Sequence, residues 1–361
     1  MARANRIQTV TLAPEDLQRA RRDHLAQLTT QHAALRSGAS ALALARGQWQ
    51  AGHYPAALRG FAEAAELEPG NPATHVSLVR AASMLGLRQD EDAWLQRARL
   101  RHPASPELLL HAALRKVPAD PPAAAGLLQT QADNPILAAY LRAIECITSG
   151  AAQAGPAPWD DPEINAQWDS LQWALEHAGA GRIHGLPLDV LATALDAWDQ
   201  QGLALECGVY FGRSLRIIAK ASPGMVHGFD SFQGLPEAWK ANEPAGAYST
   251  AGLTPEELPH NVQLHRGWFS NTLPAFLATT PGELGFLHVD CDLYSSTRTV
   301  LEAVADRIRP GTVIVFDDLL GYPGYEQHEL RAWREFSSAA GLSFEVLACC
   351  LMGREVALRI R

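Results

Sequence analysis

The sequence predicts an α/β protein, with a doubly wound and mostly parallel sheet in its second half and an all-α domain before it. Two observations predict this class. After residue 203, short apolar segments alternate with amphipathic ones, as in the βα units of a buried sheet. The first 150 residues are instead rich in Ala, Leu, Arg and Gln with helical periodicity. We therefore expect a helical domain at 1–150, a linker at 151–167 and an α/β domain at 168–361.

Composition and charge narrow the possible functions. The 361 residues suffice for two domains, and 47% hydrophobic with 19% charged residues is typical of globular proteins. A net charge of −9 without a Lys/Arg cluster argues against a nucleic-acid partner. No apolar stretch suits a signal segment or a membrane span, so we expect a cytoplasmic protein. Five cysteines without a C-x-x-C pair predict reduced, mostly buried thiols.

The helical domain contains an internal repeat of 34 residues. The sequence PGNP at 69–72 recurs as PASP at 103–106, and Gly52 recurs as Gly86. This is the period of tetratricopeptide (TPR) repeats, and we expect two good units flanked by atypical helices, with a third unit broken by VPADPP. An unrelated helical bundle with accidental periodicity is the alternative. A TPR array would bind a protein or peptide partner, or pair two subunits in a homodimer.

A glycine loop opens the predicted sheet. Residues 203–205 form a predicted buried strand, Glu206 lies at its carboxyl end, and Gly208 and Gly212 permit a sharp turn close to a ligand. A helix is predicted at 214–221. Ligands of open α/β sheets bind outside the carboxyl ends of the strands, near the following helix N-terminus. The loop is therefore the predicted centre of a ligand site, and a chance glycine turn in some other α/β protein is the alternative.

The next strand, predicted at 225–229, ends in Asp230, about 20 residues after the glycine loop. At that spacing a carboxylate can accept hydrogen bonds from ribose hydroxyls. The loop lacks the G-x-G-x-x-G pattern of dinucleotide sites, and Glu206 would repel a phosphate and attract an amino group. The pattern favours a nucleoside without phosphate, and an NAD-dependent oxidoreductase is the weakest alternative.

The remaining elements continue the alternation. Amphipathic helices at 168–177 and 186–200 precede the first strand and are expected to cover the sheet. Downstream, strands are predicted at 262–265, 286–290 and 312–316, and helices at 271–278, 295–308 and 326–339. The segments 343–348 and 355–360 flank a short turn, which predicts a hairpin and an antiparallel last strand.

Three carboxylates are predicted at one edge of the sheet. Asp290 ends one strand, and Asp317 and Asp318 end the next. Together they would repel one another, and their oxygens suit a hard divalent cation such as Mg²⁺. The alternative is that the carboxylates are solvated and one of them caps a helix, as Asp292 would for a helix beginning near Ser295.

Five ordered motifs carry a resemblance to a known family. They are ECGVYFGRS at 206–214, GFDSFQGLPEAW at 228–239, RGWFSNTLPAFL at 266–277, HVDCDLYSST at 288–297 and FDDLLGYPGYEQHE at 316–329. From about residue 203 onward the chain resembles the TylF/MycF-type (macrocin-type) O-methyltransferases, which use S-adenosylmethionine (AdoMet). The resemblance implies a class I methyltransferase fold, with a seven-stranded sheet, and methyl transfer to a hydroxyl of a sugar or natural product.

The same resemblance implies roles for individual residues. Those expected to bind AdoMet are Glu206, Gly208, Gly212, Ser214, Asp230, Ser231, Gly267 and Trp268. By this likeness Asp230 holds the ribose, and Mg²⁺ is held by Asp290, Asp317 and Asp318. The proton of the acceptor hydroxyl would go to Asp290 or to His328, which follows the GYPGY loop. For His328 the alternative is a surface histidine without a catalytic role.

The helical domain departs from the family pattern. Members of this family normally lack a TPR array, so a glycan, peptide or protein-bound acceptor joins the small-molecule acceptors as a candidate. A TPR scaffold with an inactive or regulatory AdoMet-binding domain is the alternative function. The presence of Glu206, Asp230 and the three metal acids favours an active enzyme, because an inactive site would be free to lose them.

Overall fold

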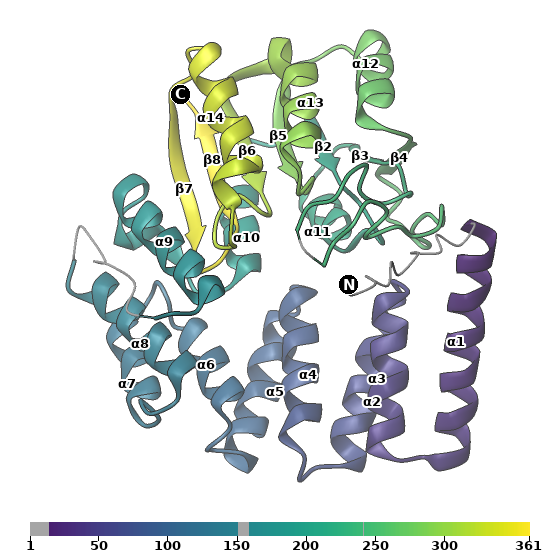
Figure 1. Cartoon of the computed structure of the whole chain (residues 1–361), viewed down its shortest axis with the longest axis vertical. Helices are drawn as coiled ribbons and strands as arrows, with labels where there is room; N and C mark the ends of the chain where they lie inside the picture. Colours follow the sequence, from purple (N-terminus) through teal and green to yellow (C-terminus); the bar gives the residue numbers. More distant parts are fainter. Residues whose placement is uncertain (1–13, 151–158, 241) are drawn as a thin grey trace, which may run out of the picture.

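The structure, a computed structural model, describes residues 14–150, 159–240 and 242–361 (Figure 1). The first part of the expected linker, 151–158, lies outside these ranges. The described chain consists of a helical part, α1 to α8, along the bottom of Figure 1, and an α/β part above it. Within the described ranges, no helix has the length and apolar character needed to cross a membrane.

The α/β part is built on one sheet of eight strands. These are β1 (Ile183–His184), β2 (Leu203–Cys207), β3 (Val226–Asp230), β4 (Val262–Arg266), β5 (Leu284–Val289), β6 (Ile308–Phe316), β7 (Phe344–Cys350) and β8 (Val356–Ile360). Their order is β1-β7-β8-β6-β5-β2-β3-β4, and β8 runs antiparallel to β6 and β7 whereas all other neighbours are parallel. The predicted fold class is confirmed, with the two-residue β1 as an eighth strand where seven were expected.

The strand order reverses between β2 and β5. From β2 the chain proceeds through β3 to β4 on one side, and β5 leads to β6 on the other. Such a switch point leaves a crevice at the carboxyl ends of the two central strands. The glycine loop after β2 and the first acidic segment after β5 both open into it.

Helices cover both faces of the sheet. They are α9 (Pro162–His177), α10 (Pro187–Ala197), α11 (Arg213–Ala221), α12 (Phe269–Thr279), α13 (Tyr294–Val304) and α14 (Glu329–Ala339), with single 3₁₀ turns at Ala180–Arg182, Ala305–Arg307 and Tyr325–Gln327. Alternate residues of a strand point to opposite faces. Phe286 of β5 packs among α10 and α11, and its neighbour Leu287 packs among α12, α13 and α14. The result is a three-layer arrangement.

The helical part consists of α1 (Pro14–Leu35), α2 (Gly38–Gln50), α3 (Tyr54–Leu67), α4 (Pro72–Met84), α5 (Arg88–Arg101), α6 (Pro106–Leu114), α7 (Pro121–Gln129) and α8 (Pro135–Thr148). The helices α2, α4 and α6 begin at 38, 72 and 106, so the period of 34 residues is present in the structure. Capping side chains followed by proline start several helices, namely those after Asn71, Ser105, Asp120, Asn134 and Asp161. Assignment of these helices to the TPR class stays a prediction.

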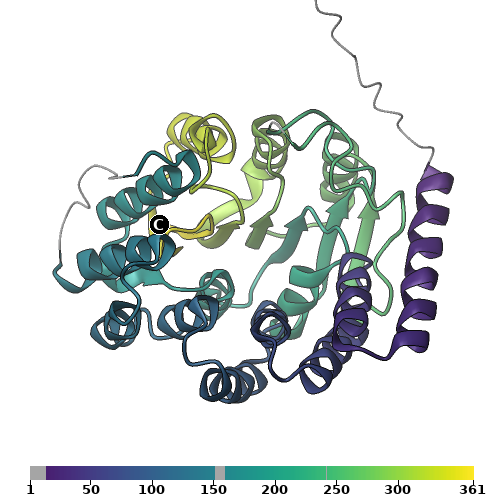
Figure 2. The same ribbon diagram turned by 60° about the horizontal axis from the view of Figure 1, so that its bottom comes forward.

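The two parts are packed together without a clean boundary. One hydrophobic core contains Ile144 of α8, Leu171 of α9 and Leu205 of β2. Helix α9 begins at Pro162, inside the segment expected to be a linker. Figure 2 shows the helical part curving along the α/β part. At the N-terminal end of the helical part, Gln18 and Arg21 of α1 donate hydrogen bonds to the carbonyls of Ala251 and Ser249.

Candidate functional site

The glycine loop joins the ends of the two central strands. Gly208 has a φ of +94°, and a Cβ atom there would collide with the carbonyl oxygen of Asp290. The N–H of Asp290 in turn donates to the carbonyl of Cys207 at 2.8 Å. Gly212, with a φ of +71°, is the residue before α11. Gly208 is therefore required for the close approach of β2 and β5, which brings the loop beside the acids.

Asp230 braces the glycine loop. Its Oδ2 accepts hydrogen bonds from the backbone N–H groups of Val209 and Tyr210, both at 2.8 Å, and its Oδ1 accepts from Phe232 at 2.6 Å. Tyr210 and Phe232 are held at φ values of +51° and +58°, which non-glycine residues seldom adopt. The carboxylate fixes the shape of the site as well as being available to a ligand.

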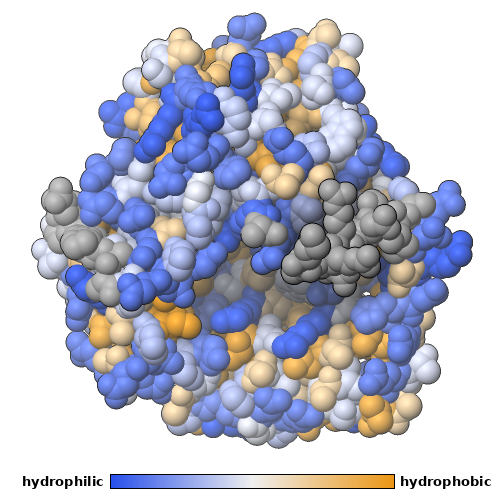
Figure 3. Space-filling model, in the orientation of Figure 1, coloured by the Kyte–Doolittle hydropathy of each residue, from blue (hydrophilic) through white to orange (hydrophobic). Residues whose placement is uncertain are grey.

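A cavity of about 350 Å³ lies at this edge of the sheet. It is lined by Gly208, Val209, Tyr210, Asp230, Ser231, Gly234, Leu235, Pro236, Trp239, Tyr248, Trp268, Phe269, Asp290, Cys291, Asp292, Ser296, Asp317, Asp318 and Arg354. Figure 3 shows that the molecule is hollowed between the helices at the bottom of the view and the α/β part. Of the predicted cofactor residues, Gly208, Asp230, Ser231 and Trp268 line this cavity; Gly212, Gly267 and Glu206 do not, and Ser214 lines a second cavity.

Three carboxylates meet in the wall of the cavity. Oxygens of Asp290, Asp292 and Asp318 lie within 4.8 Å of one another. Asp317 lies apart from this group, with its Oδ1 3.8 Å from His288 Nε2. The structure thus places Asp292 where the sequence suggested Asp317, and Asp317 as a metal ligand stays a prediction. Asp292 does not cap the following helix, because α13 begins after Leu293 without a side-chain cap.

The charges of this group are poorly compensated. Burial raises the pKa of Asp292 to about 8 and that of Asp318 to about 6, and repulsion from neighbouring carboxylates adds to both shifts. Burial and the same neighbours raise the pKa of Asp290. Arg354 opposes the shift of Asp318 by donating to its Oδ1 at 2.7 Å. Three clustered oxygen donors that repel one another fit a hard divalent cation, which would relieve the repulsion.

Glu329, the first residue of α14, was not predicted as part of the site. Its side chain is fully buried, and its two oxygens accept hydrogen bonds from the backbone N–H groups of Cys291 at 3.2 Å and Asp318 at 3.3 Å. It therefore ties together the two turns that carry the acids. The signal in the sequence was an acid placed one turn before Trp333 on the apolar face of a helix.

Glu206 lies behind the cavity wall. It is fully buried, and its Oε1 lies 2.9 Å from Nδ1 of His288, its register partner on β5. Burial alone would lower the pKa of His288, but the hydrogen bond to Glu206 and the charges of Glu206 and Asp317 together outweigh it, and the pKa is raised. Oε2 of Glu206 has no hydrogen-bond partner among the described residues. Direct contact of Glu206 with a cofactor stays a prediction.

His328 lies outside the cavity lining. Its ring is half-buried, 6.4 Å from the ring of Trp239 and 6.1 Å from that of Tyr322. Burial lowers its pKa. Of the two predicted bases, the structure places only Asp290 in the wall of the cavity, and a catalytic role for His328 stays a prediction.

Part of the chain is similar to known proteins. The protein-family model for a methyltransferase domain matches residues 205–319, which contain the glycine loop, Asp230 and the acids after β5 and β6. The chain is 28% identical over 189 residues, 45% of its length and 68% of the other protein, to 8-demethyl-8-(2,3-dimethoxy-alpha-L-rhamnosyl)-tetracenomycin-C 4'-O-methyltransferase of Streptomyces olivaceus.

Two solved structures are among the matches in shape. The calicheamicin methyltransferase CalS11 matches with a TM-score of 0.39 and 21% identity, over 63% of this chain and 93% of that one. The O-methyltransferase NovP matches with a TM-score of 0.37 and 20% identity, over 62% and 98%.

Proposed function

We propose that this chain, an S-adenosylmethionine-dependent methyltransferase, transfers a methyl group to a hydroxyl of a sugar or natural product with the help of a divalent cation. The observation that carries the proposal is one cavity lined by two chemically different groups of residues. One group contains Asp230, Ser231 and Trp268, and the other is the cluster of Asp290, Asp292 and Asp318. The relative from Streptomyces olivaceus, named for methylation of a rhamnosyl group, supports a sugar acceptor.

The first group suits a nucleoside without phosphate. Asp230 would repel a phosphate, and in the role that the sequence predicts its oxygens would accept hydrogen bonds from ribose hydroxyls. Trp268 offers an aromatic surface for a base. Because Asp230 is already fixed by backbone N–H groups, it is oriented before a ligand arrives, which lowers the entropic cost of binding.

The second group, the carboxylate cluster, suits a hydroxyl acceptor. When bound, AdoMet supplies a sulfonium methyl group, and a divalent cation supplies the charge that lowers the pKa of a hydroxyl. Asp290 and Asp318 would hold the cation together with Asp292 or Asp317. Asp290 is the predicted proton acceptor, and Asp292, which lines the same wall, is a second carboxylate available for that role. Holding acceptor and donor in one cavity orients them for in-line transfer.

A chelator experiment tests the metal. We expect EDTA to abolish turnover and Mg²⁺ to restore it, while S-adenosylhomocysteine still binds in calorimetry, because the proposed cation binds the acceptor and not the cofactor. The variant Asp290→Asn should behave like the chelated enzyme. The variant Asp306→Asn, at an exposed position remote from the cavity, is the matched control. Full turnover in EDTA would remove the metal from the proposal.

A further inference from the structure

A second cavity of about 240 Å³ lies on the face of the sheet that α10 and α11 cover. Arg213 and Ser214, the first two residues of α11, form one side of it, and Asp317 and Glu355 line it as well. Asp317 also lines the first cavity, so the two cavities share this residue in their linings.

The lining of this second cavity carries both signs of charge. Arg213, the Ser214 hydroxyl and the free N–H groups at the start of α11 favour a carboxylate. Asp317 and Glu355 favour an ammonium group. A ligand that extends from the first cavity and ends in an α-amino carboxylate has this combination of charges, and AdoMet, the donor in the proposed function, is such a ligand.

The helical part supplies the outer wall of the second cavity. Ser83 and Met84, the last two residues of α4, line it opposite α11. The turn that follows α4 packs on α10, because a Cβ atom at Gly86 would lie 3.4 Å from Leu188. One repeat earlier, Gly52 packs so closely on the glycine loop that a Cβ atom there would lie 2.6 Å from Phe211. Successive turns of the repeat therefore contact successive parts of the site.

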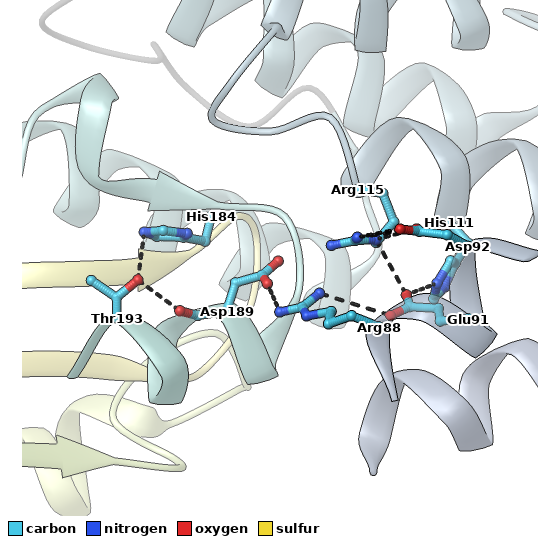
Figure 4. Close-up of polar contacts among 8 residues, drawn as sticks. All are labelled: Arg88, Glu91, Asp92, His111, Arg115, His184, Asp189 and Thr193. Atoms are coloured by element: carbon cyan, nitrogen blue, oxygen red, sulfur yellow. Dashed lines mark hydrogen bonds and ion pairs between the residues drawn. The ribbon is translucent and has the colours of Figure 1, made fainter. Parts of the chain in front are cut away.

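An ion pair fixes the α4–α5 turn in this position (Figure 4). Arg88, the first residue of α5, pairs with Asp189 of α10. On its other side Arg88 lies 3.8 Å from the buried carboxylate of Glu91, which is itself 2.7 Å from His111 and 3.5 Å from Arg115. Because Glu91 is fully buried and held by His111 and Arg115, it keeps Arg88 directed toward α10.

We propose that the α4–α5 turn of the helical part closes the second cavity over the amino-acid end of AdoMet, with the Arg88–Asp189 ion pair holding it there. The inference rests on the proposed function. It assigns the helical part to the donor site, a role different from the partner binding or subunit pairing that the sequence suggested. Residues from α4 and α5 then contribute to AdoMet affinity although they lie more than 100 residues before the glycine loop.

A larger side chain on the helical side of the second cavity tests whether the α4–α5 turn closes this cavity. Met84 is 40% exposed, so Met84→Trp leaves the core intact and places a larger side chain at the cavity. We expect S-adenosylhomocysteine to bind about tenfold or more weakly in calorimetry. Binding of 5′-methylthioadenosine, which lacks the amino-acid end, should be unchanged. Met225→Trp is the control, because Met225 is 46% exposed and lines neither cavity.

Two outcomes would overturn the inference that the α4–α5 turn closes the second cavity. One is unchanged binding of S-adenosylhomocysteine to Met84→Trp. The other is an equal loss of affinity for both ligands, which would indicate a general disturbance of the site. If the unaltered protein binds neither ligand, the AdoMet assignment fails first and the inference falls with it.

The ion pair is tested by a double-mutant cycle. Arg88→Met and Asp189→Asn should each weaken S-adenosylhomocysteine binding several-fold, about 1 kcal/mol if the loss is fivefold. The double variant should lose no more than either single variant, since both remove one interaction. Arg97→Met, at another arginine of α5 that lies outside both cavities, should bind like the unaltered protein. Additive losses would show that the two residues do not act on the turn together.

Discussion

Asp292 combines backbone strain with charge repulsion. It has a φ of +61°, and its carboxylate lies within 4.8 Å of those of Asp290 and Asp318. Non-glycine residues in this region cost free energy and are concentrated at functional sites. The proposed cation would relieve this repulsion by binding the three oxygens.

Asp292→Asn should therefore separate stability from function. Asn tolerates positive φ well, so the backbone is preserved while a carboxyl group whose ionisation is unfavourable in the fold is removed. In EDTA we expect the free energy of unfolding to rise by about 1 kcal/mol. Mg²⁺ affinity and turnover should both fall. The checks are thermal unfolding with chelator and a calorimetric Mg²⁺ titration. A less stable metal-free variant would contradict this account of the cluster.

His227 predicts a pH dependence of stability away from the site. Burial lowers its pKa to about 4, and His265, 3.1 Å away, adds to the shift. Because the unfolded chain has the higher pKa, it binds the proton first as the pH falls below about 6.5. His227→Phe, which keeps an aromatic ring beside Phe276, should remove about 2 kcal/mol of the destabilisation between pH 8 and pH 5. Denaturant titrations at both pH values measure it, and parallel losses in the two proteins would refute it.

At the scale of elements, α14 holds the two acidic turns in place through Glu329. Glu329→Gln leaves a single acceptor oxygen for the two backbone donors, Cys291 and Asp318. We expect a loss of about 1–3 kcal/mol of stability. Mg²⁺ affinity should fall, while S-adenosylhomocysteine affinity changes little. The exposed Glu326→Gln is the control. Unchanged Mg²⁺ affinity would show that α14 does not position the acids.

Most strands and helices of the sheet follow from local patterns. The strand that ends in Asp230 and the strand that leads into Asp290 were predictable because apolar runs and acids alternate along the chain. The direction of a side chain just past a strand end could not be predicted in this way. The φ of +61° at Asp292 gives it a different orientation from a continued strand, and no residue pattern indicates this.

Glu206 illustrates the same limit. Its place at a strand end was predicted, and its partner was not, because His288 comes from a strand 82 residues later and meets it through the register of β2 and β5. Register between distant strands depends on the packing of the whole sheet. The sequence therefore predicted which residues surround the site better than which of them face the cavity.

At the scale of the molecule, the helical part and the sheet form one unit. The period of 34 residues was readable, since it is carried by glycines and prolines at turns. The docking of these turns on the α/β part was not readable, because each contact joins residues far apart in sequence. The expected homodimer stays a prediction.

A substitution at the contact between the helical part and the sheet tests whether the two form one unit. Gly185 follows β1, and a Cβ atom there would collide with the carbonyl oxygen of Leu114 at the end of α6. Gly185→Ala should destabilise the protein by about 1–3 kcal/mol. It should also weaken S-adenosylhomocysteine binding, because the helical part shifts. Gly181→Ala, where a Cβ atom meets nothing within 4 Å, is the control. A variant with unaltered stability and binding would show that this contact does not hold the helical part on the sheet.

Metal-assisted methyl transfer from AdoMet to a hydroxyl can be tested with a product assay. Purified protein, AdoMet and Mg²⁺ are incubated with a small-molecule extract of the source cells, and mass spectrometry follows methylated products and S-adenosylhomocysteine. We expect an O-methylated compound formed in equal amount with S-adenosylhomocysteine. Neither product should form in EDTA or with the Asp290→Asn variant. Methylation that persists fully in EDTA, or that falls on nitrogen or carbon, would contradict it.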